Sequence, residues 1–381
     1  MKKSDIHKDL KDLKLSIWRG TGEAFLILKK YRNRRIPESF KKEILYASFH
    51  NLGYDQQMEM GRNEYMYELI LMTYNPGFFL EMLAKSFHKS QEIEDWDRCL
   101  AFEILKCFLK NGENSISQLL RQIYASNINS GYGHIIGMDL MEAEGMDAFL
   151  FIADYNGKEL LKQNGFYQSD DLLNYAKEII VNTDLESLLI EKSKTDVNIK
   201  AYLNAVVAHR EKMKRIVRSK RKKWKREKPL IGKRYREKAL ELLNNAKEFD
   251  RISEGLHLLK HNFQKDDVQL IKKILELNFN DIDEEHLILR TIVEALEGSM
   301  ERGYVEFFEQ IYLRLNCGSC RCHLVKLLIK NNLIPKWMFA EIKYDSAEEI
   351  RKAAGEYILK KEKMNTQIRN FPQIKEIAAS R

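Results

Sequence analysis

Three cysteines and one histidine fall within seven positions of the stretch NCGSCRCHLVK: Cys317, Cys320, Cys322 and His323. Thiolates and imidazoles are ligands that zinc prefers, and closely spaced cysteines also form redox motifs. A compact zinc site needs its ligands on one face of the element that carries them. On a helix, Cys320 and Cys322 diverge by about 200°, and the sequence holds no second ligand pair with zinc-site spacing.

A repeated pattern in the C-terminal third indicates which element carries the cysteines. Residues 289–293, 320–324 and 350–354 each begin with an apolar residue or cysteine and an arginine, and each ends with two core residues. The arginines, which we expect at equivalent places on successive helices, are Arg290, Arg321 and Arg351. A period near 30 residues built from helix pairs is typical of an α-solenoid.

The register of this repeat predicts where each cysteine points. Cys320 takes the place of Leu289 and Ile350 and should face the core, as should His323, whereas Cys322 should point to solvent. Cysteine is a common small core residue. We therefore expect the cluster to pack a repeat helix and to bind no metal.

The pattern over residues 281–360 resembles the second helix of HEAT-type repeats, in which a capped helix carries a valine- or isoleucine-arginine pair ahead of small core residues. Two segments near the N-terminus also look like segments of bacterial HEAT-repeat proteins: IWRGTGEAFLIL and GYDQQMEMGRNEYMYELI. The repeats here are short, and the middle copy has cysteine and histidine in place of aliphatic residues. The resemblance implies an α-solenoid with a concave recognition face and implies no activity.

Composition and periodicity predict an all-α fold. The chain has 381 residues, 31% of them charged and 44% hydrophobic, and only five prolines interrupt it. Apolar residues recur at helical spacing almost throughout, and no segment alternates long enough to predict a sheet. No apolar run approaches the roughly 20 residues of a membrane helix. Five cysteines without a secretion signal indicate a cytoplasmic protein with free thiols.

We expect an α-solenoid of antiparallel helix hairpins with a long basic helix in the middle. Breakers and composition divide the chain into four ranges: N-terminal helical hairpins (1–130), a glycine-rich helical connection (131–197), the basic helix (198–238) and HEAT-like repeats (239–381).

The basic segment, residues 210–238, holds 16 Lys/Arg and 3 Asp/Glu, a local balance of +13 in a chain whose net charge is +8. The remaining chain therefore carries −5. Such a segment suits a phosphate backbone, with an aromatic side chain to stack on bases. The candidate polyanion-binding residues are Arg210, Lys214, Arg215, Arg218, Lys220, Arg221, Lys222, Lys223, Trp224, Lys225 and Arg226. The alternative is that the segment meets the acidic remainder of the same protein or of a partner protein.

A second candidate surface lies in YDQQMEMGRNEYMYE, where Tyr54, Asp55, Arg62 and Tyr65 could line a recognition face. The alternative is that they form hydrogen bonds that fix helix packing. No catalytic motif and no cofactor motif is present. We expect a non-enzymatic scaffold that binds a protein through its concave face, without a cofactor and away from membranes. The alternative is a HEAT-like nucleic-acid-binding protein, with alkylpurine DNA glycosylases as the enzymatic example.

Overall fold

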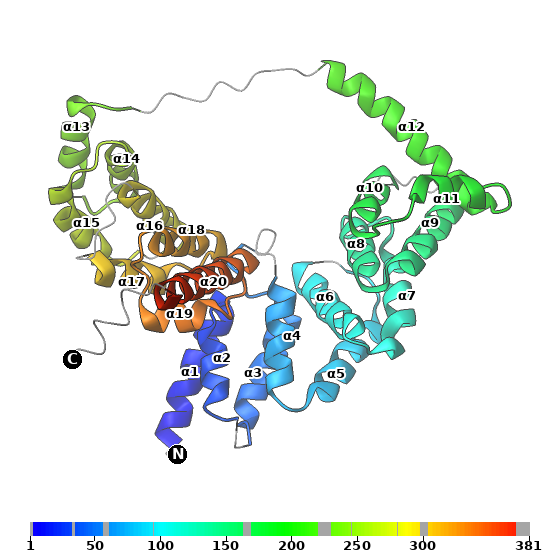
Figure 1. Cartoon of the computed structure of the whole chain (residues 1–381), viewed down its shortest axis with the longest axis horizontal. Coiled ribbons are helices and arrows are strands. Elements are labelled where there is room, and N and C mark those ends of the chain that lie inside the picture. The colour runs from blue at the N-terminus through cyan, green and yellow to red at the C-terminus, as the bar shows by residue number, and fades with distance from the viewer. Residues whose placement is uncertain are drawn as a thin grey trace. The chain divides into compact units, whose positions relative to one another are not determined.

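The structure is a computed structural model, and it describes residues 3–32, 35–55, 61–93, 95–162, 169–219, 230–244, 246–279, 281–297 and 304–370. Within these ranges the chain forms twenty α-helices, two short 3-10 helices and no strand (Figure 1). The all-α prediction is confirmed. None of the described helices combines the length and the apolar character needed to cross a bilayer.

Two compact units make up the chain. The first unit contains residues 1–35, 52–65 and 226–381, and the second contains residues 36–51 and 66–225. The grouping differs from the expected domain ranges, which follow the chain in order. The first 35 residues pack with the C-terminal helices, and the basic segment carries the chain from the second unit back to the first.

The second unit is built on helices α3 to α12. Their bounds are α3 (Glu38–Phe49), α4 (Arg62–Met72, beginning in the first unit), α5 (Pro76–Lys89), α6 (Trp96–Lys110), α7 (Ser117–Asn127), α8 (Gly133–Glu144), α9 (Met146–Leu161), α10 (Ser169–Ile179), α11 (Leu185–Lys192) and α12 (Val197–Ser219), with a 3-10 turn at Asn114–Ile116. Gly157 lies on α9 where α12 crosses it, and a Cβ atom there would stand 1.8 Å from the carbonyl oxygen of Asn198. The glycine therefore permits the close approach of the two helices.

The first unit combines two N-terminal helices with eight C-terminal ones. They are α1 (Lys3–Arg19), α2 (Glu23–Lys29), α13 (Lys233–Leu243), α14 (Phe249–Leu259), α15 (Val268–Leu275), α16 (Ile282–Leu296), α17 (Val305–Arg314), α18 (Gly318–Lys330), α19 (Lys336–Ile342) and α20 (Glu348–Asn370), with a 3-10 turn at Lys265–Asp267. Contacts run mostly between neighbouring helices, and α14, α16, α18 and α20 pack in that order. This succession is consistent with a solenoid.

Buried positions recur on α16, α18 and α20, but in a register that differs from the expected one. Leu289, Arg321 and Ile350 are all fully buried, at intervals of 32 and 29 residues. The residue that aligns with Leu289 is therefore Arg321 rather than Cys320. The sequence pattern aligned the three arginines with one another. Burial instead aligns Arg321 with the aliphatic residues Leu289 and Ile350.

This shift corrects the expected orientations in the cysteine stretch. Cys322 is buried rather than exposed, the side chain of His323 is 40% exposed rather than in the core, and Cys320 is half-buried. The three expected equivalent arginines also differ, because Arg290 is 56% exposed and Arg321 is fully buried. The physical reason is an ion pair that makes the core position acceptable to an arginine, described below.

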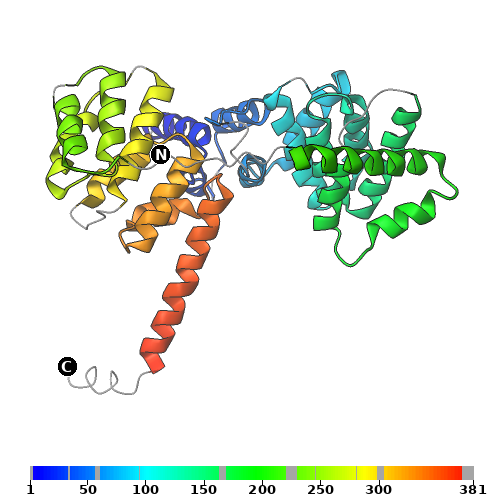
Figure 2. The same cartoon turned by 90° about the horizontal axis from the view of Figure 1, so that it is seen from above.

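The N-terminal helices close against the loop between α19 and α20, and Figure 2 shows α1 and α2 beside these C-terminal helices. The backbone N–H of Ser346 donates to the carbonyl oxygen of Gly20 at 2.7 Å. Gly20 has a φ of +72°, and a Cβ atom there would lie 2.0 Å from the Ser346 hydroxyl oxygen. The turn after α1 therefore needs glycine both for its left-handed backbone and for the close contact.

Candidate functional site

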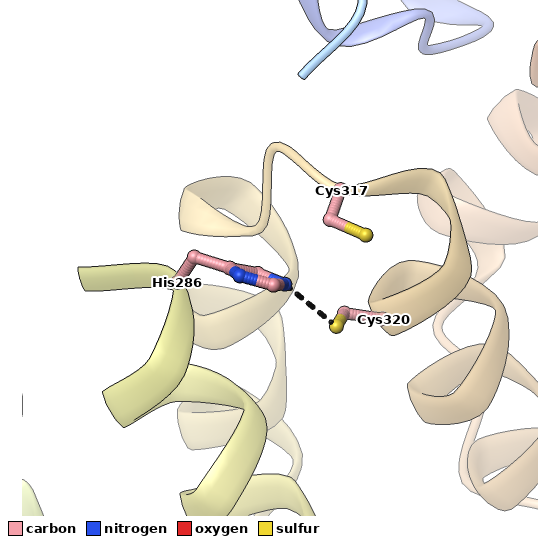
Figure 3. Close-up of side chains that lie close together, drawn as sticks. All are labelled: His286, Cys317 and Cys320. Atoms are coloured by element: carbon pink, nitrogen blue, oxygen red, sulfur yellow. Dashed lines mark hydrogen bonds between the residues drawn. The ribbon is translucent and has the colours of Figure 1, made fainter. Parts of the chain in front are cut away.

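His286, Cys317 and Cys320 form a compact cluster in the first unit (Figure 3). One potential ligand atom from each, an imidazole nitrogen or a sulfur, lies within 4.8 Å of the other two. Among the described residues, no other set of three or more His, Cys, Asp or Glu side chains meets this criterion. Cys317 is the N-cap of α18, Cys320 lies in the first turn of α18, and His286 lies on α16.

Helix starts position all three side chains. Cys317 has an extended backbone (φ −74°, ψ 123°) just before α18, so the thiols at the N-cap and three residues later both lie at the beginning of the helix. Asp281 caps α16 by accepting from the backbone N–H groups of Asp283 and Glu284, at 2.7 and 3.0 Å. Since α16 and α18 pack side by side, the first turns of α16 bring His286 to the start of α18.

Hydrogen bonds fix the imidazole of His286 on both sides. Its Nε2 lies 3.0 Å from the sulfur of Cys320, and its Nδ1 lies 3.2 Å from the hydroxyl oxygen of Tyr54. The Tyr54 hydroxyl donates its single hydrogen to Asp283 Oδ1, so it accepts from Nδ1–H of the imidazole. We infer that the neutral ring carries its proton on Nδ1 and that Nε2 presents a lone pair to the thiols.

The two thiols differ in acidity because they share a proton. A hydrogen bond from Cys320, followed by one involving His286, lowers the pKa of Cys317 well below its usual range. The neighbouring Cys317 and burial raise the pKa of Cys320. Burial, and then the hydrogen bond to Asp283, raise the pKa of Tyr54, which keeps this phenol neutral. The cluster therefore brings two thiol groups of different acidity and one imidazole close to one another.

The rest of the cysteine stretch points elsewhere. The sulfur of Cys322 lies 3.5 Å from Oε2 of Glu349 on α20, and Nε2 of His323 lies 3.8 Å from Oε2 of Glu297, just after α16. Neither residue belongs to the cluster with Cys320. The sequence grouped four neighbours along the chain, whereas the structure separates them into a thiol pair at the helix start and two residues that contact other acidic side chains.

His286 was missed by the sequence reasoning, which looked for ligands within the stretch or in a paired motif. It precedes Cys317 by 31 residues and Cys320 by 34, which is about one repeat period. In stacked helices, residues one period apart are neighbours in space. The signal that would have found it is therefore a histidine one repeat before a C-x-x-C pair.

The proposed recognition residues near position 60 take different places. Tyr54 belongs to the cluster, and Asp55 is half-buried. Arg62 is buried and donates to the carbonyl oxygens of Ile17 and Trp18.

Tyr65 is also buried, and its hydroxyl donates to the carbonyl oxygens of Ser16 (3.3 Å) and Thr21 (2.9 Å). Arg62 and Tyr65 therefore hold the end of α1 against the start of α4 and do not form part of an exposed surface. The structure thus supports the packing alternative for these two residues.

The middle of the basic segment, residues 220–229, lies outside the described residues, and with it Lys220, Arg221, Lys222, Lys223, Trp224, Lys225 and Arg226. The side chains of Lys214, Arg215 and Arg218, on α12, lie outside them as well.

At the described ends of the segment, three basic residues pair with acids of their own unit. Arg210 contacts Glu186 at 2.9 Å, Arg236 contacts Asp267 at 2.6 Å and Lys238 contacts Glu254 at 2.5 Å. These pairs are of the kind expected if part of the segment is neutralised within the protein.

A buried lysine forms a separate ionic cluster in the second unit. The ammonium group of Lys106 pairs with Asp139 and, at 3.1 Å, with Glu142, and so joins α6 to α8. Burial disfavours the charged lysine, but the two carboxylates outweigh it and raise the pKa of Lys106. The opposite charges compensate within the core, so the arrangement serves packing rather than chemistry.

Protein-family models, curated proteins and solved structures were compared with the chain. None matches it. The structure itself shows that the described chain is all-helical. A HEAT-like family is a proposal that rests on the repeated sequence pattern.

Proposed function

We propose that the protein is a non-enzymatic helical scaffold that binds another protein through the stacked second helices of its first unit. The observation that carries this proposal is a mixed-charge surface that continues from helix to helix. We call it the second-helix face and define it by Lys260, Arg290, Glu294, Glu297, His323, Lys326 and Glu349.

Ion pairs link each helix of this face to the next. Lys260, just after α14, contacts Glu294 on α16 at 2.6 Å. His323 on α18 faces Glu297, just after α16, and Lys326 on α18 pairs with Glu349 on α20.

The outer members of these pairs remain accessible. The side chain of Glu349, for example, is 71% exposed. Exposed ion pairs contribute little to stability, about 0–1 kcal/mol each, so their recurrence is better explained by recognition than by folding. In solenoids, such stacked helices form an extended recognition surface.

The signs of the charges favour a protein partner over a nucleic acid. A surface that follows a phosphate backbone is strongly positive, whereas this face alternates acids and bases. Exposed leucines lie on the same helices, Leu287 on α16 and Leu359 on α20. Protein–protein interfaces combine an apolar core with a polar rim.

Affinity purification of the full chain from native lysate, with and without nuclease, tests this proposal. The informative variant reverses two charges of the second-helix face, Arg290→Glu with Lys326→Glu. The matched control reverses two exposed lysines of the second unit, Lys85→Glu with Lys194→Glu. We expect a protein that is retained after nuclease treatment, lost with the first variant and kept with the control. Capture that disappears with nuclease, or equally with both variants, would refute the proposal.

A further inference from the structure

We propose that His286, Cys317 and Cys320 bind one zinc ion through Nε2 and the two sulfur atoms, leaving one coordination position for water or an exogenous ligand. The donor set suits zinc, which takes thiolate and imidazole ligands in tetrahedral geometry. This inference does not depend on the proposed partner binding, because it concerns the starts of α16 and α18 rather than the second-helix face.

The distances between ligand atoms match a coordination sphere. Zinc–sulfur bonds of about 2.3 Å and zinc–nitrogen bonds of about 2.0–2.1 Å place tetrahedral ligand atoms roughly 3.5–3.8 Å apart. All three atoms lie within 4.8 Å of one another, and Nε2 is 3.0 Å from the Cys320 sulfur. Adjustments of about 1 Å or less therefore convert the hydrogen-bonded cluster into a metal site.

The surroundings of His286 are those of a metal ligand. Histidines that bind metals usually donate their other ring N–H to an oxygen, which fixes the tautomer and the ring orientation. Here the hydroxyl oxygen of Tyr54 accepts a hydrogen bond from Nδ1–H, and the same hydroxyl donates to Oδ1 of Asp283. Packing holds the ring as well, since the centroids of the Tyr54 and His286 rings are 4.7 Å apart.

Protons leave as the ion binds. Cysteine binds zinc as the thiolate, so any proton on the sulfur atoms of Cys317 and Cys320 leaves to solvent when the metal binds. Binding therefore weakens as the pH falls.

A dithiol–disulfide couple is the competing chemistry for a C-x-x-C pair at a helix start. It explains the two thiols but gives no role to His286, Tyr54 or Asp283. Exchange with another protein also requires an accessible attacking sulfur. Cys317 is only 5% exposed, which suits an ion better than a protein substrate.

Cobalt titration of the reduced, chelator-treated full chain tests the site. Co²⁺ bound by thiolates in a tetrahedral site shows sulfur-to-metal charge-transfer and intense visible absorption. We expect one Co²⁺ per chain, displaced by one Zn²⁺. Cys317→Ser, Cys320→Ser and His286→Gln should each lower the affinity by at least about 100-fold. Tyr54→Phe should lower it by about 10–100-fold with the stoichiometry unchanged.

Cys322→Ser is the matched control, because it removes a buried thiol of the same stretch that lies outside the cluster. It should bind Co²⁺ like the unmodified chain. Circular dichroism establishes which variants fold. If the cysteine variants do not fold, the comparison of Tyr54→Phe with the unmodified chain still decides the test. Absence of the thiolate spectrum in the unmodified chain, or its equal loss in Cys322→Ser, would overturn the site. So would alkylation and mass spectrometry that find a Cys317–Cys320 disulfide after the reduced chain has been mixed with Zn²⁺ and exposed to air.

Discussion

Arg321 occupies a core position that the preceding and following repeats fill with leucine and isoleucine. Its guanidinium group is fully buried and binds the equally buried carboxylate of Asp345 through two bonds, Nε–Oδ2 at 3.2 Å and Nη2–Oδ1 at 3.1 Å. A third bond runs from Nη1 to the carbonyl oxygen of Asn316 at 2.8 Å. Through this pair, the packing of α18 depends on the loop that follows α19.

We expect Arg321→Met to destabilise the first unit strongly. Methionine fills most of the volume, so the principal loss is electrostatic, because Asp345 becomes an unpaired carboxylate in the core. Breaking a buried pair in this way costs about 3–5 kcal/mol. For a unit of this size, 1 kcal/mol corresponds to about 2–4 °C in melting temperature, so the expected decrease is roughly 6–20 °C.

The double variant Arg321→Met with Asp345→Asn separates the charge from the packing. It removes both charges and should recover part of the lost stability, because a neutral amide is easier to bury than a carboxylate. Arg290→Met is the control. Arg290 is exposed, and among the described residues it pairs with Glu294 of its own helix, at 3.0 Å. Its removal should cost about 0.3–0.5 kcal/mol. Chemical denaturation of the four proteins gives the free energies; an Arg321→Met loss no larger than that of Arg290→Met would refute this reasoning.

Four further predictions concern the fold and the basic segment. Ile350→Ala should cost about 2–5 kcal/mol in a denaturation experiment, because it opens a cavity at a fully buried position. Burial raises the pKa of Glu341 to about 7. The preference of the folded chain for the protonated carboxyl therefore contributes its full stability below the unfolded pKa near 4.5, and this contribution is lost as the pH rises through 7. Thermal melts from pH 5 to 8 should therefore show Glu341→Gln gaining up to roughly 3 kcal/mol on the unmodified chain, and a constant difference would contradict this. Gly20→Ala should cost more than Gly112→Ala, since both have positive φ but only the first would clash; equal losses in urea would exclude the clash. Charge reversal of six basic residues within 210–238 should abolish weak binding to DNA at low salt, with no binding near physiological salt in either protein; tight binding there would favour the nucleic-acid alternative.

The helical fold was predictable because its causes are local. Few prolines, helical spacing of apolar residues and capping residues such as Asp281 act within one or two turns of the chain. Burial of Leu289 and Ile350 was predicted from the repeat and is confirmed. The register between them failed at Arg321, because its burial depends on Asp345, and nothing in the local pattern distinguishes a buried arginine from an exposed one.

Only the part of the candidate site that lies close together in the sequence could be predicted. The spacing of Cys317 and Cys320 is visible in the sequence, whereas their position at a helix start is seen only in the structure. The imidazole comes from another helix, and the phenol that orients it comes from Tyr54, more than two hundred residues earlier. Contacts at such separations follow from packing, which the apolar pattern of a single sequence does not encode.

The position of Tyr54 connects the site to the way in which the first unit is assembled. The described residues within 52–65 belong to the same unit as the C-terminal helices, and they supply Tyr54 to His286 and Arg62 to the end of α1. Solenoids need their terminal repeats covered, because an exposed apolar end would associate with other chains. Here α1 and α2 lie against the loop after α19, where the N–H of Ser346 meets the carbonyl of Gly20. The N-terminal helices therefore pack against the end of the C-terminal helices, and the later segment that supplies Arg62 to α1 also supplies Tyr54 to His286.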